Sequence, residues 1–164
     1  IETLVLPCVD TSSIDDKDEE NRFLNYFKKK KDFLKKFNVD IAIESDYPPK
    51  KLKNFILKLP RDIFYINYDI GNSASMGFNP EEEITQYSSF IKNVHVKDRV
   101  LNGTTVPLGE GDADFDSVIK YLSEANYKGN FILQTARDDK SQHLKTLLKY
   151  KKFIESKLIN YYKK

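Results

Sequence analysis

Apolar side chains gather in five short runs along the chain, separated by longer segments in which charged residues dominate. The runs are TLVLPCV (3–9), VDIAIE (39–44), IFYINYD (63–69), FIKNVHV (90–96) and NFILQT (130–135). Most are rich in β-branched and aromatic residues and several are apolar almost throughout, which is typical of parallel strands covered on their faces. The pattern therefore predicts five strands of a parallel sheet.

The segments between these runs have the spacing of amphipathic helices. Helices are predicted over 19–37, 50–59, 81–90, the segment that follows Asp114, and 141–162. In the first of them Phe23, Phe27 and Leu34 form part of one apolar face. Alternating strands and helices predict right-handed βαβ units in a single α/β domain over residues 1–164. A doubly wound sheet and part of a barrel both fit this order, although no glycine-rich nucleotide-binding loop follows the first strand.

Polar side chains follow or end each predicted strand, on the side of the sheet where parallel α/β folds place their chemistry. Glu44, Asp69 and His95 stand at three successive strand ends. Taken alone, each has a plain structural explanation: an ion pair, a turn cap and a core histidine, respectively. Together, two carboxylates and one imidazole suit a divalent ion such as Mn, Co, Mg or Zn. A metal site is therefore the favoured interpretation.

The segment NGTTVPLGEGDADF (102–115) is rich in glycine and has no helical pattern. It is long enough to form a functional loop over the strand ends. A plain connection between strand and helix is the alternative.

Composition and charge narrow the function classes. The chain has 164 residues, 40% of them hydrophobic and 32% charged, and a formal net charge of only +2. This charge gives no broad basic surface for nucleic acid, and no apolar run approaches the ~20 residues of a membrane span. Cys8 is the single cysteine, which fits a reducing compartment. We therefore expect a cytoplasmic protein with neither a nucleic-acid nor a membrane partner.

Several segments, taken in order, resemble the sugar phosphate isomerase/epimerase family with its xylose-isomerase-like TIM barrels. They are NYDIGNSASMG, VHVKDR, VPLGEGDADF and FILQTAR, and LVLPCVDTSS and IAIESDYPP fit the two preceding strands. The resemblance implies that the chain forms the C-terminal five-eighths of a barrel, from about the fourth strand onward. Since five strands cannot close an eight-stranded barrel, we expect a truncated part of a longer protein. Coverage of the open edges by a second copy, in a homo-oligomer, is the alternative.

The resemblance also implies a ligand set. In this family a metal is held by a Glu, an Asp, a His and a second Glu from successive strands, which fall on Glu44, Asp69, His95 and Gln134. The fourth position departs from the family because Gln134 cannot exchange a proton, so only Glu44 remains as an acid or base. Asn72 is a second departure, since several relatives place a substrate-binding histidine there.

The predicted function is a metal-dependent isomerase or epimerase that moves a proton in a sugar or sugar phosphate through an enediolate. Glu44 would shuttle the proton. The substrate would be bound by side chains that follow the same strand ends, namely Asn72, Lys97, Asp98, Arg99 and Arg137. Two alternatives remain open: a lyase or dehydratase on the same fold, and a non-catalytic sugar-binding descendant, which Gln134 favours.

Overall fold

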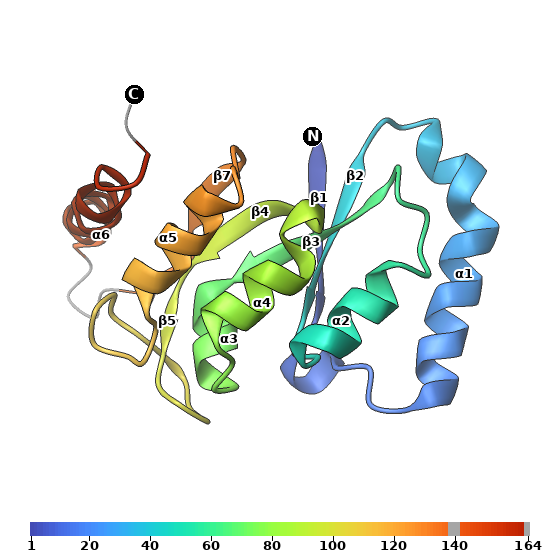
Figure 1. The fold of residues 1–164 in the computed structure, drawn as a ribbon, viewed down its shortest axis with the longest axis horizontal. Helices are drawn as coiled ribbons and strands as arrows, with labels where there is room; N and C mark the ends of the chain where they lie inside the picture. The colour runs from blue at the N-terminus through green and yellow to red at the C-terminus, as the bar shows by residue number, and fades with distance from the viewer. Residues whose placement is uncertain (138–141, 163–164) are drawn as a thin grey trace.

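The structure is a computed structural model that describes residues 1–137 and 142–162, and within these residues five strands form one parallel sheet. The strands are β1 (Thr3–Cys8), β2 (Asp40–Ser45), β3 (Phe64–Asp69), β4 (Ile91–Val96) and β7 (Asn130–Leu133), and they lie side by side in the order β1-β2-β3-β4-β7 (Figure 1). Each pairs in parallel with the next. The five predicted strands and their parallel arrangement are confirmed.

Helices follow these strands and cover one face of the sheet. They are α1 (Lys17–Lys35), α2 (Pro49–Ile56), α4 (Pro80–Tyr87) and α5 (Phe115–Glu124) (Figure 1). Three of them begin at a side chain that caps the first turn: Asp16, Asn79 and Asp114 accept hydrogen bonds from backbone amides three residues further on. Such caps satisfy donors that a helix start leaves free, so the helix starts are fixed by local sequence.

The hydrophobic core lies between this helical layer and the sheet. Alternate strand residues such as Ile43, Ile66 and Val94 are almost wholly buried and pack with helical side chains such as Phe55 and Leu122. Because successive strand residues point to opposite faces, the residues between them face away from the helices. The centre of that inner face is polar. Its buried polar side chains are those of Glu44, Asn67, Asp69, Asn93 and His95.

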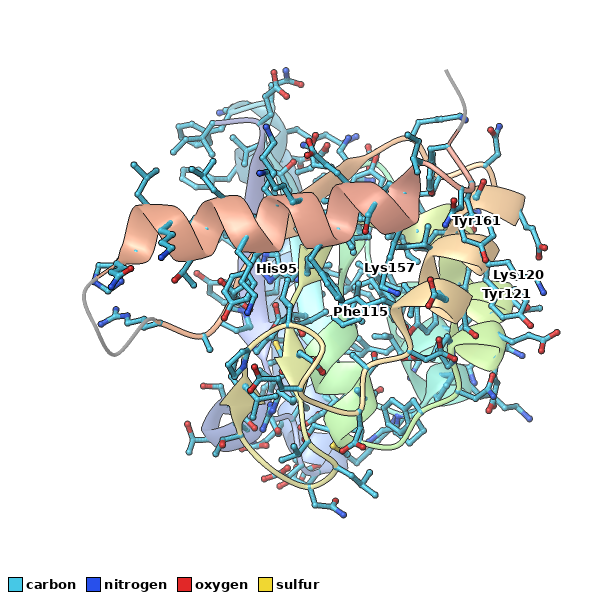
Figure 2. All side chains as sticks on the ribbon, turned by 90° about the vertical axis from the view of Figure 1, so that its left-hand side faces the viewer. His95, Phe115, Lys120, Tyr121, Lys157 and Tyr161 are labelled. Carbon is cyan, nitrogen blue, oxygen red and sulfur yellow. The ribbon has the colours of Figure 1, made fainter. Side chains whose placement is uncertain are left out.

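Helix α6 (His143–Leu158) lies across the β7 side of the molecule, as Figure 2 shows. The ring of Phe153 contacts that of Phe115 with centroids 5.3 Å apart, and Lys157 Nζ lies 2.8 Å from Asp116 Oδ2. Leu144 and Leu148 of the same helix are exposed. Helix α6 therefore packs on α5 and leaves part of its own apolar surface uncovered.

Two features near the inner face were not predicted. The short helix α3 (Ile70–Ser75) follows β3 directly, and it begins at Asp69. The segment predicted as a loop contributes β6 (Thr105–Val106), which pairs in antiparallel fashion with β5 (Asp98–Arg99).

Across residues 1–137 and 142–162, no helix is both long and apolar enough to span a membrane.

Candidate functional site

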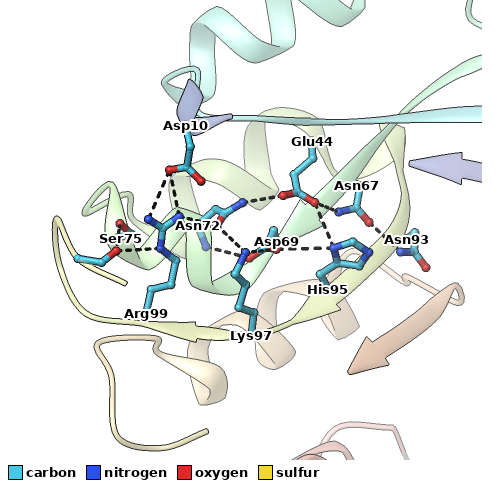
Figure 3. Close-up of polar contacts among 11 residues, drawn as sticks. Asp10, Glu44, Asn67, Asp69, Asn72, Ser75, Asn93, His95, Lys97 and Arg99 are labelled. Atoms are coloured by element: carbon cyan, nitrogen blue, oxygen red, sulfur yellow. Dashed lines mark hydrogen bonds and ion pairs between the residues drawn. The ribbon is translucent and has the colours of Figure 1, made fainter. Parts of the chain in front are cut away.

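Three strand ends bring two carboxylates and one imidazole together on the inner face of the sheet. Glu44 comes from β2, Asp69 from β3 and His95 from β4 (Figure 3). Asp69 and His95 are register partners in the paired strands. One ligand atom from each of the three buried residues lies within 4.8 Å of the others. The three residues selected from the sequence therefore form one compact group.

His95 points its Nδ1 atom at both carboxylates. The atom lies 3.1 Å from Glu44 Oε2 and 3.6 Å from Asp69 Oδ2. It is buried, and among the described residues it has no hydrogen-bond partner of suitable geometry. A buried polar atom without a partner is costly, and a divalent ion between nitrogen and carboxylate ligands would remove that cost. The donor set thus fits a metal.

The pKa of His95 reflects the charges of the two carboxylates beside it. Burial disfavours the charged imidazole, but the adjacent carboxylates of Asp69 and Glu44 outweigh burial and raise the pKa of His95 to about 9. Two buried carboxylates therefore attract a positive charge at this point. A proton on His95 or a bound cation can supply it.

Amide side chains hold Glu44 in place. Asn67 Nδ2 donates to Glu44 Oε2 at 2.7 Å, and Asn72 Nδ2 donates to Glu44 Oε1 at 2.7 Å. Asn67 in turn accepts a hydrogen bond of 2.7 Å from Asn93 Nδ2 (Figure 3). Partners of this kind orient metal-binding carboxylates and tune their affinity. Asn67 and Asn93 were missed from the sequence, although each stands two residues before a predicted ligand and so shares its face of the sheet.

The two carboxylate oxygens of Asp69 have different partners: one caps a helix and the other faces the site. Its Oδ1 accepts the backbone N–H of Asn72 at 2.8 Å and caps α3. Its Oδ2 faces His95 and lies 3.3 Å from Lys97 Nζ. The capping role and the ligand role, considered as alternatives from the sequence, are therefore compatible.

Two cations meet at the other end of the site. Lys97 Nζ and Arg99 Nη1 each donate to Asn72 Oδ1 at 2.9 Å. Arg99 also donates through Nε to the carbonyl of Gly103 at 3.0 Å, and its Nη2 lies 3.4 Å from Asp10 Oδ1. Three of the residues predicted to bind substrate thus meet at Asn72, which contacts both Lys97 and Arg99. Asn72 also contacts Glu44, and Lys97 contacts Asp69, so two of the three reach the metal-ligand candidates.

Asp98 has a different position from the one predicted. It is completely buried, and its two oxygens accept backbone N–H bonds from Gly109 and Gly111 (Oδ2, 2.8 and 3.1 Å) and from Ala113 (Oδ1, 3.1 Å). A carboxylate that is shielded from solvent and shared by three amides cannot also bind a sugar. We therefore correct its predicted role from substrate binding to holding the 102–115 segment.

The remaining candidates lie at or beyond the end of β7. Gln134 follows the strand by one residue and is exposed. It lies two residues beyond Ile132, the register partner of His95, so it belongs to the same face. Arg137 is exposed and lines a surface pocket with residues of α6, including His143. Arg137 thus lies with α6 residues at the surface, and its contact with substrate stays a prediction, while His143 is exposed as predicted.

The chain is similar in sequence to curated proteins and in fold to solved structures. The chain is 29% identical over 116 residues to an inosose dehydratase of Clostridium botulinum, a match that covers 58% of this chain and 39% of that protein. The solved structure of the IolI protein with a bound zinc atom has a TM-score of 0.82 at 19% identity, over 99% of this chain and 65% of that chain. An L-ribulose 3-epimerase structure has a TM-score of 0.76 at 15% identity, over 90% and 57%. The chain thus spans less than two thirds of each of these relatives.

The family comparison covers most of the chain. Residues 2–154 match the family described as "Xylose isomerase-like TIM barrel". The sheet order and the helices on one face agree with an arc of such a barrel, and the resemblance noted in the sequence is confirmed. The chain belongs to the xylose isomerase-like TIM barrel family.

Proposed function

We propose that this chain carries the metal-binding half of an active site that removes a proton next to the carbonyl group of a sugar or sugar phosphate. The observation that carries the proposal is the convergence of Glu44, Asp69 and His95, with the buried Nδ1 of His95 facing both carboxylates. The favoured reaction is isomerisation or epimerisation.

Glu44, Asp69 and His95 would hold the ion, and Gln134 would add its amide oxygen as a fourth ligand. Mixed oxygen and nitrogen ligands suit Mn, Co, Mg or Zn. When bound, a divalent ion polarises a substrate carbonyl and stabilises the negative charge of an enediolate. Since Glu44 also lies at this point, its carboxylate is placed to take the proton from the adjacent carbon.

Lys97 and Arg99 would bind the anionic part of the substrate. Both cations donate to the neutral amide oxygen of Asn72, and their side chains are only 15% and 16% exposed. An arginine fork and a lysine ammonium are the groups that bind phosphate and developing oxyanions. A phosphate or an enediolate oxygen next to Asn72 could take donors from both side chains.

A dehydratase is the second candidate, and Gln134 favours it. Inversion at one carbon uses a base on one side and an acid on the other, and an amide at position 134 supplies neither. Elimination of water next to a carbonyl needs one base for the proton and one acid for the departing hydroxyl. Glu44 and Lys97 could supply these, and the similar protein of Clostridium botulinum is named an inosose dehydratase.

The test is calorimetric titration of the chain with Mn²⁺, followed by incubation with ketose, ketose phosphate and inosose substrates in deuterated water. Metal binding that is lost in Glu44→Gln supports the site. Deuterium at the carbon next to the carbonyl, with a new sugar stereoisomer, indicates the epimerase; an unsaturated or deoxy product indicates the dehydratase. Absence of Mn²⁺ binding would overturn the proposal. Binding of metal and sugar without deuterium exchange would indicate a sugar-binding descendant.

A further inference from the structure

Another buried carboxylate lies on the helical side of β3, opposite the candidate metal ligands. Glu83 of α4 is only 2% exposed. Its Oε1 accepts hydrogen bonds from Tyr87 Oη at 2.7 Å and Ser73 Oγ at 2.8 Å, and its Oε2 accepts one from Tyr68 Oη at 2.9 Å. We call Glu83 and these three hydroxyl residues the Glu83 cluster.

Burying the Glu83 cluster in a helix–sheet interface carries a desolvation cost in free energy. Burial raises the pKa of Glu83, and the three hydroxyl donors oppose that rise only in part. Apolar side chains of similar volume would fill the same space without the desolvation cost. The cluster is therefore better explained by what it holds in place than by a gain in stability.

Two members of the cluster are direct sequence neighbours of site residues. Tyr68 precedes Asp69 in β3, and because strand side chains alternate, Tyr68 reaches Glu83 while Asp69 faces the site. Ser73 follows Asn72 in α3. Glu83 thus ties the end of β3 and the middle of α3 to α4.

Helix α3 needs such an external attachment. It has six residues, and a helix of this length is not stable on its own. Its other side packs closely against Lys97 at Gly71. A Cβ added at Gly71 would lie 2.7 Å from Lys97 Cγ and 3.0 Å from Lys97 C, so no larger residue fits there without a shift. Asn72 lies between these two supports, and its amide contacts Glu44, Lys97 and Arg99.

We propose that Glu83 is a positioning residue for the metal site, acting through Ser73 and Tyr68 to fix Asn72 and Asp69. This inference rests on the proposed function, because it assumes that Glu44 and Asp69 bind a cation. Glu83 lies outside the site, and it would keep the Glu44 carboxylate and the amide of Asn72 in their relative positions.

Two hydroxyl deletions form a matched pair for the test. Ser73→Ala and Tyr87→Phe each remove one hydrogen bond to Glu83 Oε1, but only Ser73 belongs to α3. We expect Ser73→Ala to weaken Mn²⁺ binding about tenfold in calorimetric titration, in the range found for outer partners of metal ligands. Tyr87→Phe should change the affinity less than twofold while lowering the melting temperature to a similar degree. Equal Mn²⁺ affinity in the two variants would overturn the inference.

Two further variants test Glu83 itself. Glu83→Gln keeps an amide oxygen for Ser73 and should retain most of the affinity, whereas Glu83→Leu should lose at least as much as Ser73→Ala. Wild-type affinity in a folded Glu83→Leu protein would overturn the inference. If Glu83→Leu does not fold, the comparison of Ser73→Ala with Tyr87→Phe still decides.

A metal-free measurement separates this inference from the proposed function. The side-chain NH₂ signals of Asn72 in a ¹⁵N-correlated NMR spectrum report its contacts with Glu44. We expect them to move in Ser73→Ala and to stay in place in Tyr87→Phe. If the wild-type chain binds no Mn²⁺, the proposed function fails. Asn72 signals that are also unmoved in Ser73→Ala would overturn the positioning role.

Discussion

Asn72 and Glu44 are joined by a hydrogen bond of 2.7 Å from Asn72 Nδ2 to Glu44 Oε1. The oxygen of the same amide accepts hydrogen bonds from Lys97 and Arg99. The orientation of the Asn72 amide is therefore fixed, with its donor toward the negative part of the site and its acceptor toward the positive part. Asn72 therefore separates the two charged parts of the site.

Replacing Asn72 should weaken cation binding. Asn72→Leu has a similar volume but removes a donor to Glu44 and the shared acceptor of Lys97 and Arg99. We expect Mn²⁺ affinity to fall by about 10- to 100-fold, measured by calorimetry. Asn54→Leu, at an exposed position of α2, is the matched control and should leave the affinity unchanged. Equal affinities in the two variants would contradict the role of Asn72.

Restoring a carboxylate at position 134 should have the opposite effect. Gln134→Glu adds a third negative ligand beside Glu44 and Asp69, and ligand charge helps to set affinity for hard cations. We expect tighter Mn²⁺ binding by about tenfold or more. Gln86→Glu adds the same charge to α4 on the helical side and serves as the control. If both changes have the same small effect, the side chain of Gln134 does not reach the metal.

Cation binding should release a proton. The pKa of His95 in the metal-free chain is about 9, against an ordinary value of 6.5, and a histidine must lose this proton to bind a metal. At pH 7 the proton must therefore leave, and affinity should fall about tenfold for each pH unit below 9. Titrations in two buffers with different ionisation enthalpies should give close to one released proton per Mn²⁺. A value near zero at pH 7 would show that His95 is already neutral or is not a ligand.

The same pKa sets a pH dependence of stability without metal. Because folding raises the pKa of His95, the folded chain holds its proton more tightly than the unfolded chain. The stabilisation is complete below pH 6.5 and is lost as pH rises to about 9. We expect the melting temperature in a chelator to fall over this interval. The fall should be smaller in His95→Gln; an equal fall in both proteins would assign it to another group.

Asp98 should matter for stability and not for the cation. Asp98→Ala leaves three partly buried backbone N–H groups without their acceptor, which we expect to cost roughly 3 kcal/mol. Asp116→Ala removes an exposed ion pair with Lys157 and should cost less than about 1 kcal/mol. Urea denaturation measures both. A loss of Mn²⁺ affinity in folded Asp98→Ala beyond twofold would return Asp98 to the site.

The parts of the fold that sequence predicts well are those with long, regular patterns. The five strands and the larger helices follow from apolar runs and amphipathic spacing, and Glu44, Asp69 and His95 follow from their strand ends. Helix α3 was missed because IGNSAS is one short stretch with a glycine and several weak helix formers. Its stability comes from the Asp69 cap and from packing, which no local pattern records.

The Glu83 cluster shows a second limit. In PEEEI, three successive glutamates suit the positive start of a helix, so Glu83 does not stand out from Glu81 and Glu82. Only the fold turns it inward, toward hydroxyl groups from β3, α3 and its own helix. Its spacing of four residues from Tyr87 places both on one side of α4, which is the single signal that sequence offered.

Because Asp69 serves both α3 and the cation position, cation binding and the folding of α3 influence each other. One oxygen of the side chain starts α3 and the other faces the cation position, so the helix and the ion depend on the same carboxylate. By mass action, cation at a hundred times its dissociation constant would stabilise the ordered state by about 2.7 kcal/mol. The coupling is reciprocal: mutations that only alter the helical population of residues 70–75 would shift the dissociation constant of an ion that none of those side chains touches.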